Sequence, residues 1–234
     1  MSKNILIVDD EKALTNLIEI YLKNEGYTVY KCYNAKQALQ YIKSTHLDLA
    51  ILDVMLPDID GFTLCSKIRE QHFFPVIMLT SKSENSDKIT GLTMGADDYI
   101  VKPFDPLELT ARVKTHLRRY TQYNRQPDSK PEETEITEYD LRGLTINKAT
   151  RQCFLYGEEL SFTPIEFSIL WYLCEHRGAV VPSDELFEAV WGETFYDNNN
   201  TVIAHISRIR EKMKEPAKKP QFIKTVWGIG YKLE

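Results

Sequence analysis

Short apolar runs alternate with longer amphipathic stretches through residues 1–120, and this alternation restricts the fold more than any other feature of the chain. Residues 5–8, 49–52 and 76–79 are continuously apolar, as strands are when both faces of a parallel sheet are covered. Shorter strands are predicted at residues 27–32 and 99–101. Between them, apolar residues recur with a period of about 3.6, which is typical of helices packed on one side. The pattern predicts an α/β domain with a doubly wound, five-stranded parallel sheet.

The chain is long enough for two domains, and its composition changes near residue 120. Its 234 residues exceed the length of about 100–150 residues that is usual for one domain. Residues 121–140 are polar and contain two prolines, which is typical of a linker. We therefore predict one domain at residues 1–120 and a second at residues 141–234.

The second half has a different order of elements. Its predicted elements are strands at residues 144–146 and 152–156, a helix opened by Thr163 and Pro164, helices from Ser183 and over residues 199–213, and a β-hairpin over residues 222–233. Thr163 suits an N-cap and Pro164 the first helical position. Glycines among apolar residues favour the hairpin. Three helices followed by a hairpin indicate a winged helix-turn-helix domain of the α+β class.

Charged and hydroxyl residues end four of the strands predicted in the first domain. Asp9 and Asp10 follow the first strand, Asp53 ends the third, Thr80 the fourth and Lys102 the fifth. Functional groups in an open α/β sheet gather at the carboxyl ends of its strands, so these side chains are expected to meet in one pocket. An aspartate at a strand end is often only a turn residue, but the four strand ends together favour a functional site.

The chemistry predicted for that pocket is phosphoryl transfer. Converging carboxylates repel one another unless a cation or a raised pKa relieves them, and oxygen ligands without His or Cys suit Mg²⁺. Asp53 is predicted to attack an incoming phosphoryl group as a carboxylate nucleophile. Thr80 and Lys102 are predicted to hold the oxygens of the transferred group.

This half resembles the CheY-like receiver domains over nearly all of residues 3–120. The resemblance rests on IVDDE at 7–11, LDVMLP at 52–57 with Asp60 and Gly61 following, MLTS at 78–81, GADDY at 95–99 and KPF at 102–104. It implies that Asp53 is the phosphoacceptor and that Asp9 or Asp10, Asp53 and the main-chain carbonyl of Met55 hold Mg²⁺. It also implies a cis peptide bond between Lys102 and Pro103.

The receiver resemblance further implies a switch in which Thr80 swings toward the phosphoryl group and Tyr99 turns inward behind it. Tyr99 taken alone is better explained as an ordinary strand aromatic. Resemblance to the OmpR/PhoB subfamily implies a two-fold dimer interface with the cross-subunit pairs Lys88–Glu108, Asp98–Arg112 and Asp97–Arg119. The residues of that interface are Lys88, Ile89, Leu92, Asp97, Asp98, Glu108, Ala111, Arg112 and Arg119. Solvated helix faces are the alternative, and one exposed pair contributes only about 0–1 kcal/mol.

The third helix predicted in the second half is amphipathic. Its core-facing residues are expected to be Val202, Ile206, Ile209 and Met213. The opposite stripe is expected to face outward and to enter a DNA major groove. That stripe consists of Thr201, Ala204, His205 and Arg208. Arg208 is the predicted base contact and Arg210 the predicted phosphate contact, with a solvated basic face as the alternative.

Residues 141–234 resemble the OmpR/PhoB winged-helix domains. The matching segments are LSFTPIEF at 160–167, VWG at 190–192, NTV at 200–202, REK at 210–212 and TVWGIGY at 225–231. The resemblance implies a DNA contact at residue 200 and an RNA polymerase contact near residues 191–199. Asn200, Ser207 and Trp227 stand where arginine is frequent in the family. The wing is therefore expected to lack the minor-groove arginine that is usual in the family. Lys224 or Lys232 is expected to substitute weakly through a phosphate contact, with a shallower salt dependence of DNA binding.

Charge and cysteine content are compatible with this assignment. The whole chain has a net charge of −5, but residues 198–234 hold eight Lys and Arg against three Glu, a local excess of positive charge that favours contact with phosphates. The four cysteines form no CxxC pair and no zinc spacing, so buried thiols in a reducing compartment are expected. Neither a signal peptide pattern nor an apolar run near the roughly 20 residues of a membrane span is present. We therefore expect a cytoplasmic protein.

The predicted function is a phosphorylation-controlled transcription regulator and not a turnover enzyme. The overall pattern is most similar to VanR-type regulators of glycopeptide-resistance genes. The implied partners are a sensor histidine kinase, promoter DNA, RNA polymerase and a second copy of the chain. Alternatives are a catalytic second domain, an RNA-binding antiterminator and a DNA binder that ignores phosphorylation. The first lacks a recognisable nucleophile–base pair, the hairpin argues against the second, and only a measurement excludes the third.

Overall fold

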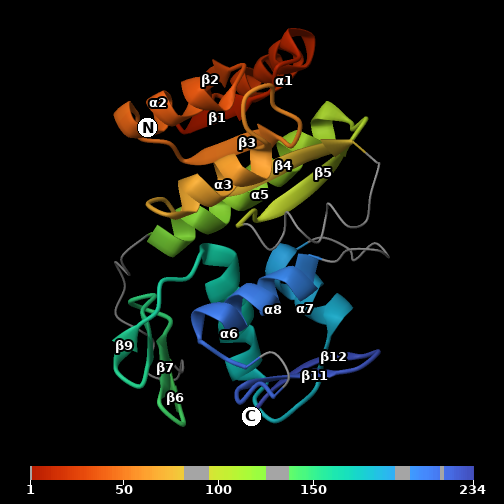
Figure 1. Cartoon of the computed structure of the whole chain (residues 1–234). Helices are drawn as coiled ribbons and strands as arrows, with labels where there is room; N and C mark the ends of the chain where they lie inside the picture. The colour runs from red at the N-terminus through yellow and green to blue at the C-terminus, as the bar shows by residue number, and fades with distance from the viewer. Residues whose placement is uncertain (1, 82–94, 125–136, 193–200, 217–218) are drawn as a thin grey trace. The chain divides into compact units, whose positions relative to one another are not determined.

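The computed structural model describes residues 2–81, 95–124, 137–192, 201–216 and 219–234 (Figure 1). The chain divides into two compact units, Met1–Tyr120 and Thr121–Glu234. No helix in these ranges is long and apolar enough to cross a membrane. The four cysteines are buried and free, as their spacing predicts.

The first unit is a parallel sheet covered by helices on both faces. Its elements are β1 (Asn4–Val8), α1 (Lys12–Asn24), β2 (Thr28–Cys32), α2 (Ala35–Ser44), β3 (Leu49–Asp53), α3 (Gly61–Arg69), β4 (Val76–Ser81), β5 (Asp98–Lys102) and α5 (Pro106–Asn124). The strand order is β2-β1-β3-β4-β5, and every neighbouring pair is parallel. The predicted five-stranded, doubly wound sheet is confirmed.

The continuous apolar runs are explained by two cores, one on each face of the sheet. Leu6, Val8 and Leu52 pack with α2 and α3, whereas Ile5 and Ile7 pack with α1 and α5. The two pairs of helices accordingly lie on opposite faces in Figure 1. Since neighbouring residues of a strand point to opposite faces, both must be apolar when both faces are covered.

The predicted linker at residues 121–140 overlaps a helix at its start and a strand at its end. Helix α5 continues to Asn124, and strand β6 begins at Glu138. Strand β6 pairs with β7, and the ring of Tyr139 lies 5.0 Å from that of Trp171, so the end of this polar segment belongs to the second unit.

The second unit joins two small sheets to three helices. Its elements are β6 (Glu138–Leu141), β7 (Leu144–Asn147), β8 (Cys153–Leu155), β9 (Glu158–Glu159), α6 (Pro164–Glu175), β10 (Val181–Pro182), α7 (Ser183–Trp191), α8 (Thr201–Lys212), β11 (Ile223–Val226) and β12 (Gly230–Leu233). Strands β6 to β9 form an antiparallel sheet in chain order, and β10-β12-β11 form a second sheet. The winged-helix prediction is confirmed, but it missed the short strands β6, β9 and β10.

A buried carboxylate connects α6 to α8. Thr163 and Glu166 form the capping box that starts α6, and Glu166 is 1% exposed. Lys212 Nζ donates to Glu166 Oε2 at 2.6 Å, and Arg208 Nη1 lies 3.6 Å from Oε1. Burial would raise the pKa of Glu166, but Lys212 and Arg208 lower it overall. Glu166 therefore fixes α8 onto α6 by charge as well as by packing.

Candidate phosphoacceptor and DNA-binding sites

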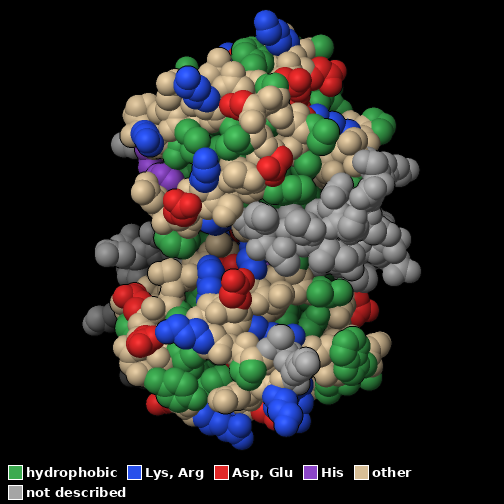
Figure 2. All heavy atoms as spheres, viewed as in Figure 1, with side chains coloured by type: hydrophobic (Ala, Val, Ile, Leu, Met, Phe, Trp, Pro, Cys, Tyr) green, Lys and Arg blue, Asp and Glu red, His purple; other side chains and the backbone are tan. Residues whose placement is uncertain are grey.

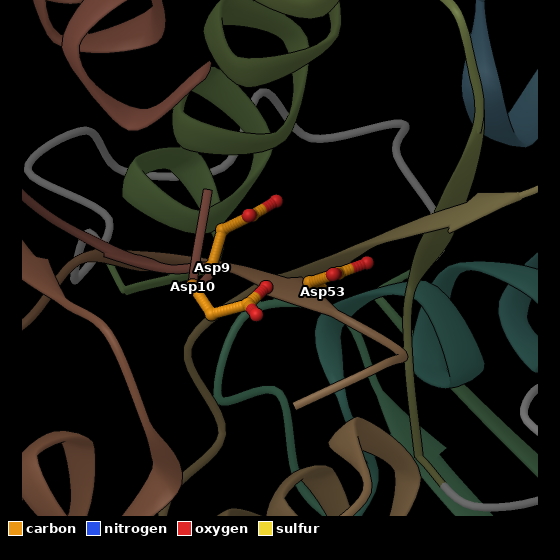
Figure 3. A group of neighbouring side chains, drawn as sticks. All are labelled: Asp9, Asp10 and Asp53. Carbon is orange, nitrogen blue, oxygen red and sulfur yellow. The ribbon is translucent and has the colours of Figure 1, made fainter. Parts of the chain in front are cut away.

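Three carboxylates meet at the carboxyl edge of the parallel sheet. Asp9 and Asp10 follow β1, and Asp53 ends β3 (Figure 3). One oxygen of each carboxylate lies within 4.8 Å of the others, with Asp9 and Asp53 buried and Asp10 exposed. Strands β1 and β3 are parallel neighbours in register, so their ends emerge side by side. The structure brings together the three carboxylates that the strand pattern predicts there.

The ammonium group of Lys102 lies between two of these carboxylates. Its Nζ donates to Asp9 Oδ2 at 2.7 Å and lies 3.2 Å from Asp53 Oδ1. Burial raises the pKa of Asp53, Lys102 opposes this and the charge of Asp9 adds to it. Burial alone would lower the pKa of Lys102, but its hydrogen bond to Asp9 and the charges of Asp53 and Asp9 raise it overall. Lys102 therefore stays charged and partly neutralises an acidic pocket.

The loop after β3 folds back tightly over Asp53. The amide of Gly61 donates to Val54 O at 2.8 Å, and a Cβ on Gly61 would lie 2.0 Å from the main-chain oxygen of Asp53. Glycine is therefore required where the loop meets β3. The amide of Met55 bonds to the Asp53 carboxylate, and the Met55 side chain is 70% exposed. The main chain at Met55 thus lies beside Asp53, and the role of its carbonyl as a Mg²⁺ ligand stays a prediction.

The donor set of this pocket fits a hard divalent cation. Its three side chains offer only carboxylate oxygens, the ligand type that Mg²⁺ prefers. The amide of Glu11 donates to Asp9 Oδ1 at 2.9 Å, which fixes the rotation of that carboxylate. Asp10 is exposed, so a hydrated ion can reach the cluster from solvent.

The two residues predicted as switch elements lie on neighbouring strands, Thr80 on β4 and Tyr99 on β5. Thr80 is buried, its register partner is Val101 on β5, and its Oγ1 lies 3.3 Å from Ser81 O. Tyr99 is half-buried and packs against the core that α2 and α3 share. The peptide bond between Lys102 and Pro103 is cis, as the resemblance implies. The switch itself stays a prediction.

Two of the predicted cross-subunit acids are bound within their own chain. Asp97 was expected to pair with Arg119, but it is 1% exposed and Arg69 Nη2 donates to its Oδ2 at 2.5 Å. Asp97 Oδ2 also accepts the amide of Val76 at 2.8 Å. In this conformation Asp97 is therefore held by Arg69 from α3, and its cross-subunit pairing with Arg119 stays a prediction. Nothing in the local sequence pattern singles out Arg69.

Asp98 forms a second intramolecular cluster. Arg112 Nη1 lies 3.1 Å from Asp98 Oδ2, and His116 Nε2 lies 3.2 Å from the same oxygen. Burial would raise the pKa of Asp98, but His116 and Arg112 lower it overall. Arg112 also contacts Glu108 at 3.0 Å. The Asp98–Arg112 pairing is thus present, within one chain. Ala111 is exposed and Arg119 half-buried, and the remaining predicted interface residues, Lys88, Ile89 and Leu92, lie outside the described residues.

The outward stripe predicted for α8 is not exposed. Its members are buried, with exposed fractions of 1% for Thr201, 2% for Ala204, 0% for His205 and 5% for Arg208. Arg208 Nη1 lies 3.6 Å from Glu166 Oε1, and the His205 ring lies 5.4 Å from that of Trp191, so both side chains face the interior of the second unit. The exposed residues of the helix are instead Ile203, at 54%, Ser207 and Glu211. The predicted burial of Val202, Ile206, Ile209 and Met213 is confirmed.

The side chains predicted to contact DNA phosphates also bind partners within the second unit. Arg210 donates from Nη2 to Ile223 O at 2.7 Å and to Thr225 Oγ1 at 2.8 Å. Lys224 Nζ donates to Pro220 O at 2.6 Å, and Lys232 Nζ lies 3.6 Å from Glu234. Arg210 therefore holds the hairpin against α8 in this conformation. Asn200 and residues 193–199 of the predicted polymerase loop at 191–199 lie outside the described residues.

The raised pKa of Asp53 predicts a stability effect with a definite sign. The Asp53 carboxyl group keeps its proton to a higher pH in the folded state than in the unfolded state, where the pKa of Asp is about 3.9. The contribution of Asp53 to stability therefore falls as pH rises above that value. We expect Asp53→Asn to raise the unfolding midpoint at pH 7 in chelator-treated buffer and to have little effect below about pH 4. Denaturant unfolding followed by circular dichroism measures this.

Asp58→Asn is the matched control with the opposite sign. Burial would raise the pKa of Asp58, but the amides of Ala35 and Lys36 lower it overall, so its contribution to stability is present above the unfolded pKa and is lost as pH falls. Asp58→Asn should therefore destabilise the protein at pH 7. A lower midpoint for Asp53→Asn than for the unmodified protein in metal-free buffer would contradict the electrostatic account of the pocket.

Comparison with known proteins assigns both units to a family. Residues 5–114 match the response regulator receiver domain, and residues 157–233 match the transcriptional regulatory protein C-terminal domain. The chain is 56% identical to regulatory protein VanRc of Enterococcus gallinarum over 234 residues and 53% identical to VanR of Enterococcus faecium over 235, covering 100% of each chain in both cases. Its fold is similar to that of the response regulator DrrB, a Thermotoga maritima OmpR/PhoB homologue, with a TM-score of 0.51 and 32% identity, covering 100% of this chain and 99% of that one. The chain belongs to the two-component response regulators of the OmpR/PhoB type, which are transcription regulators and not turnover enzymes.

Proposed function

We propose that this regulator accepts a phosphoryl group on Asp53 from a sensor histidine kinase and then binds promoter DNA as a homodimer. The observation that carries the proposal is the acidic pocket. Asp53 lies within 4.8 Å of two further carboxylates and 3.2 Å from the Lys102 ammonium group. The match to the receiver family supports a kinase as donor, and the match to the C-terminal regulatory domain supports DNA as the target.

In the proposed transfer, a carboxylate oxygen of Asp53 attacks the phosphorus of a phosphohistidine. The phosphorus–nitrogen bond breaks, and the histidine nitrogen keeps the electron pair. Mg²⁺ held by Asp9, Asp10, Asp53 and the Met55 carbonyl would supply positive charge to the transferred oxygens. Lys102 would exchange its contact with Asp53 for a phosphoryl oxygen, and the hydroxyl of Thr80 would donate to another. The movement of Thr80 and Tyr99 would then carry the signal to the dimer surface.

The proposed output is transcriptional control from the cytoplasm. Pairing of two receiver units would bring two DNA-binding units onto adjacent half-sites, because linked modules raise the effective concentration of the second contact. RNA polymerase would contact the loop before α8. The similarity to VanRc and VanR supports target genes in glycopeptide resistance or cell-wall metabolism.

Phosphorylation is tested by intact-mass spectrometry after incubation with Mg²⁺ and acetyl phosphate. We expect one added phosphoryl group on the unmodified protein, and none on Asp53→Asn or in the presence of EDTA. Asp58→Asn is the control for a neighbouring aspartate, since its carboxylate accepts the amides of Ala35 and Lys36 outside the pocket, and it should be labelled normally. Absence of an adduct with several donors, on folded protein, would remove Asp53 as the phosphoacceptor.

The proposed dimer is tested by a charge exchange. Because each cross-subunit Lys88–Glu108 pair occurs twice in a two-fold interface, Glu108→Lys should weaken the phosphorylated dimer, by about 0–1 kcal/mol for each pair lost plus the new repulsion. The double change Glu108→Lys with Lys88→Glu should restore it. Sedimentation velocity of phosphodonor-treated protein measures both. A double variant as weakly associated as Glu108→Lys alone would contradict the pairing.

A further inference from the structure

The C-terminal end of α8 borders a pocket that shares no residue with the acidic pocket of the first unit. Its volume is about 310 Å³, within the range of about 300–1,000 Å³ that is typical of small-molecule sites. Its walls come from β8 and the turn that follows it, from the end of α8 and from the segment before β11. The apolar residues that line it are Leu155, Tyr156, Leu160, Met213, Pro216 and Phe222. The second unit therefore contains a cavity of ligand size that the proposed phosphoryl transfer does not use.

The way α8 ends fixes the position of Glu215, which also lines this pocket. Beyond Lys212, the last residue of the helix, Lys214 has a positive φ of 55°. The amide of Lys214 donates to Glu211 O at 2.9 Å, and the amide of Glu215 donates to Arg210 O at 2.8 Å. This pair of bonds forms a Schellman motif, which usually has glycine at the left-handed position. The last turn of α8 therefore holds the backbone of Glu215 in place.

The two carboxylate oxygens of Glu215 have different surroundings. Oε1 accepts the amides of Gln221, at 2.6 Å, and Phe222, which ties the end of α8 to the segment that leads into β11. Oε2 is buried and accepts no hydrogen bond from the described residues. Burying a carboxylate oxygen without a donor is unfavourable. The structural role of Glu215 thus uses one oxygen and leaves the other available as an acceptor.

The nearby guanidinium group of Arg210 does not supply the missing donor. Burial lowers the pKa of Arg210 and the charge of Glu215 opposes this shift, so the two groups are close enough to interact. Arg210 nevertheless donates its hydrogen bonds to Ile223 O and Thr225 Oγ1. It therefore reduces the negative charge near Glu215 without satisfying Oε2.

The two lysines that line the pocket are each bound to an acid. Lys214 Nζ donates to Glu158 Oε2 at 3.0 Å, and Lys212 Nζ donates to Glu166 Oε2 at 2.6 Å. Figure 2 likewise shows Lys and Arg side chains beside Asp and Glu side chains on the visible face of the second unit. The paired lysines do not favour an anion in the pocket, and Glu215 offers its acceptor to a molecule that carries a donor.

An aromatic side chain is held at the edge of the pocket. Tyr156 is 68% exposed, but its amide donates to Gly143 O at 2.7 Å. A Cβ on Gly143 would lie 2.5 Å from Cδ1 of the tyrosine ring, so the ring rests directly on this glycine. Its centroid lies 6.5 Å from that of Phe222. Since aromatic faces attract ammonium groups, the two rings and the acceptor of Glu215 together favour a ligand that combines apolar surface with a positive charge.

We propose that this pocket binds a small apolar amine, whose ammonium group donates to Glu215 Oε2 and whose hydrocarbon part packs against Phe222 and Tyr156. The inference depends neither on phosphorylation nor on DNA binding. Because Glu215 ties the end of α8 to the segment before β11, the bound amine would stabilise the second unit.

Amide NMR spectra of the isotope-labelled, full-length protein test the site, with phenethylamine as the probe. We expect saturable shifts of the Gln221 and Phe222 amides, since both donate to the carboxylate that the ammonium group would contact. Phenethyl alcohol keeps the ring and a donor but lacks the charge, so it should bind several-fold more weakly. Phenylacetate would bring a second carboxylate to Glu215 and should not bind.

Glu215→Gln tests the acceptor itself. The carbonyl oxygen of glutamine can accept the two amides in place of Oε1, but the amide nitrogen then replaces Oε2 and cannot accept a hydrogen bond. We expect the affinity for phenethylamine to fall by about 10- to 150-fold, the effect of losing a hydrogen bond to a charged group. Glu159→Gln is the matched control, because Glu159 is exposed and does not line the pocket.

Tyr156→Ala tests the aromatic edge. Its side chain is largely exposed, so its removal leaves the core intact. The affinity for phenethylamine should fall by about 2- to 30-fold, the effect of losing a cation–π contact.

Three results would overturn the inference. The first is the absence of saturable shifts when phenethylamine is added to folded protein. The second is equal affinity of the unmodified protein and of folded Glu215→Gln. The third is binding of phenethyl alcohol or phenylacetate as tight as that of the amine. If circular dichroism shows that Glu215→Gln does not fold, Tyr156→Ala decides, and unchanged affinity in that variant contradicts the inference. None of these results bears on the phosphorylation of Asp53, which is tested separately.

Discussion

The ammonium group of Lys102, held between Asp9 and Asp53, is the interaction on which the chemistry of the first unit depends. It relieves the repulsion of carboxylates that the parallel sheet forces together, because strands β1, β3 and β5 all end at one edge. Lys102 does not cancel this repulsion completely, since burial and the charge of Asp9 still leave the pKa of Asp53 raised. A pocket with one cation and three acids retains a net negative charge, which favours a divalent ion and, with it, a phosphoryl group.

Charge is used differently in the second unit, where cations hold the DNA-binding elements together. Lys212 and Arg208 bind the buried Glu166, and Arg210 binds the hairpin backbone. These contacts orient α8 and the wing but leave few cations on the exposed face of the helix. An acidic chain with a net charge of −5 can thus belong to a DNA-binding family, because the total charge of a chain does not set the charge of one face.

The sequence predicted the sheet and its pocket well because both follow from simple periodicity. Strands buried on both faces are continuously apolar, and the residues that follow them meet at one edge whatever the loops do. Periodicity could not predict that Arg69 binds Asp97 or that His116 joins Asp98, because such pairings depend on how separate elements pack. Periodicity also predicted the wrong environment for Arg208. It gives the direction of a side chain around the helix axis, but it does not show that the buried carboxylate of Glu166 lies on the neighbouring helix. Strands β6, β9 and β10 are too short to produce a pattern.

Calorimetric titration of Mg²⁺ into the unmodified protein and into Lys102→Met tests the central claim most directly. If Lys102 occupies part of a cation site, its removal unbalances the three carboxylates, and Mg²⁺ should bind more tightly, by about tenfold for each 1.4 kcal/mol of repulsion relieved. Asp53→Asn, which removes a ligand, should bind more weakly in the same titration. Equal or weaker Mg²⁺ binding by folded Lys102→Met would contradict the account, because the ammonium group would then support the ion site in place of competing with it.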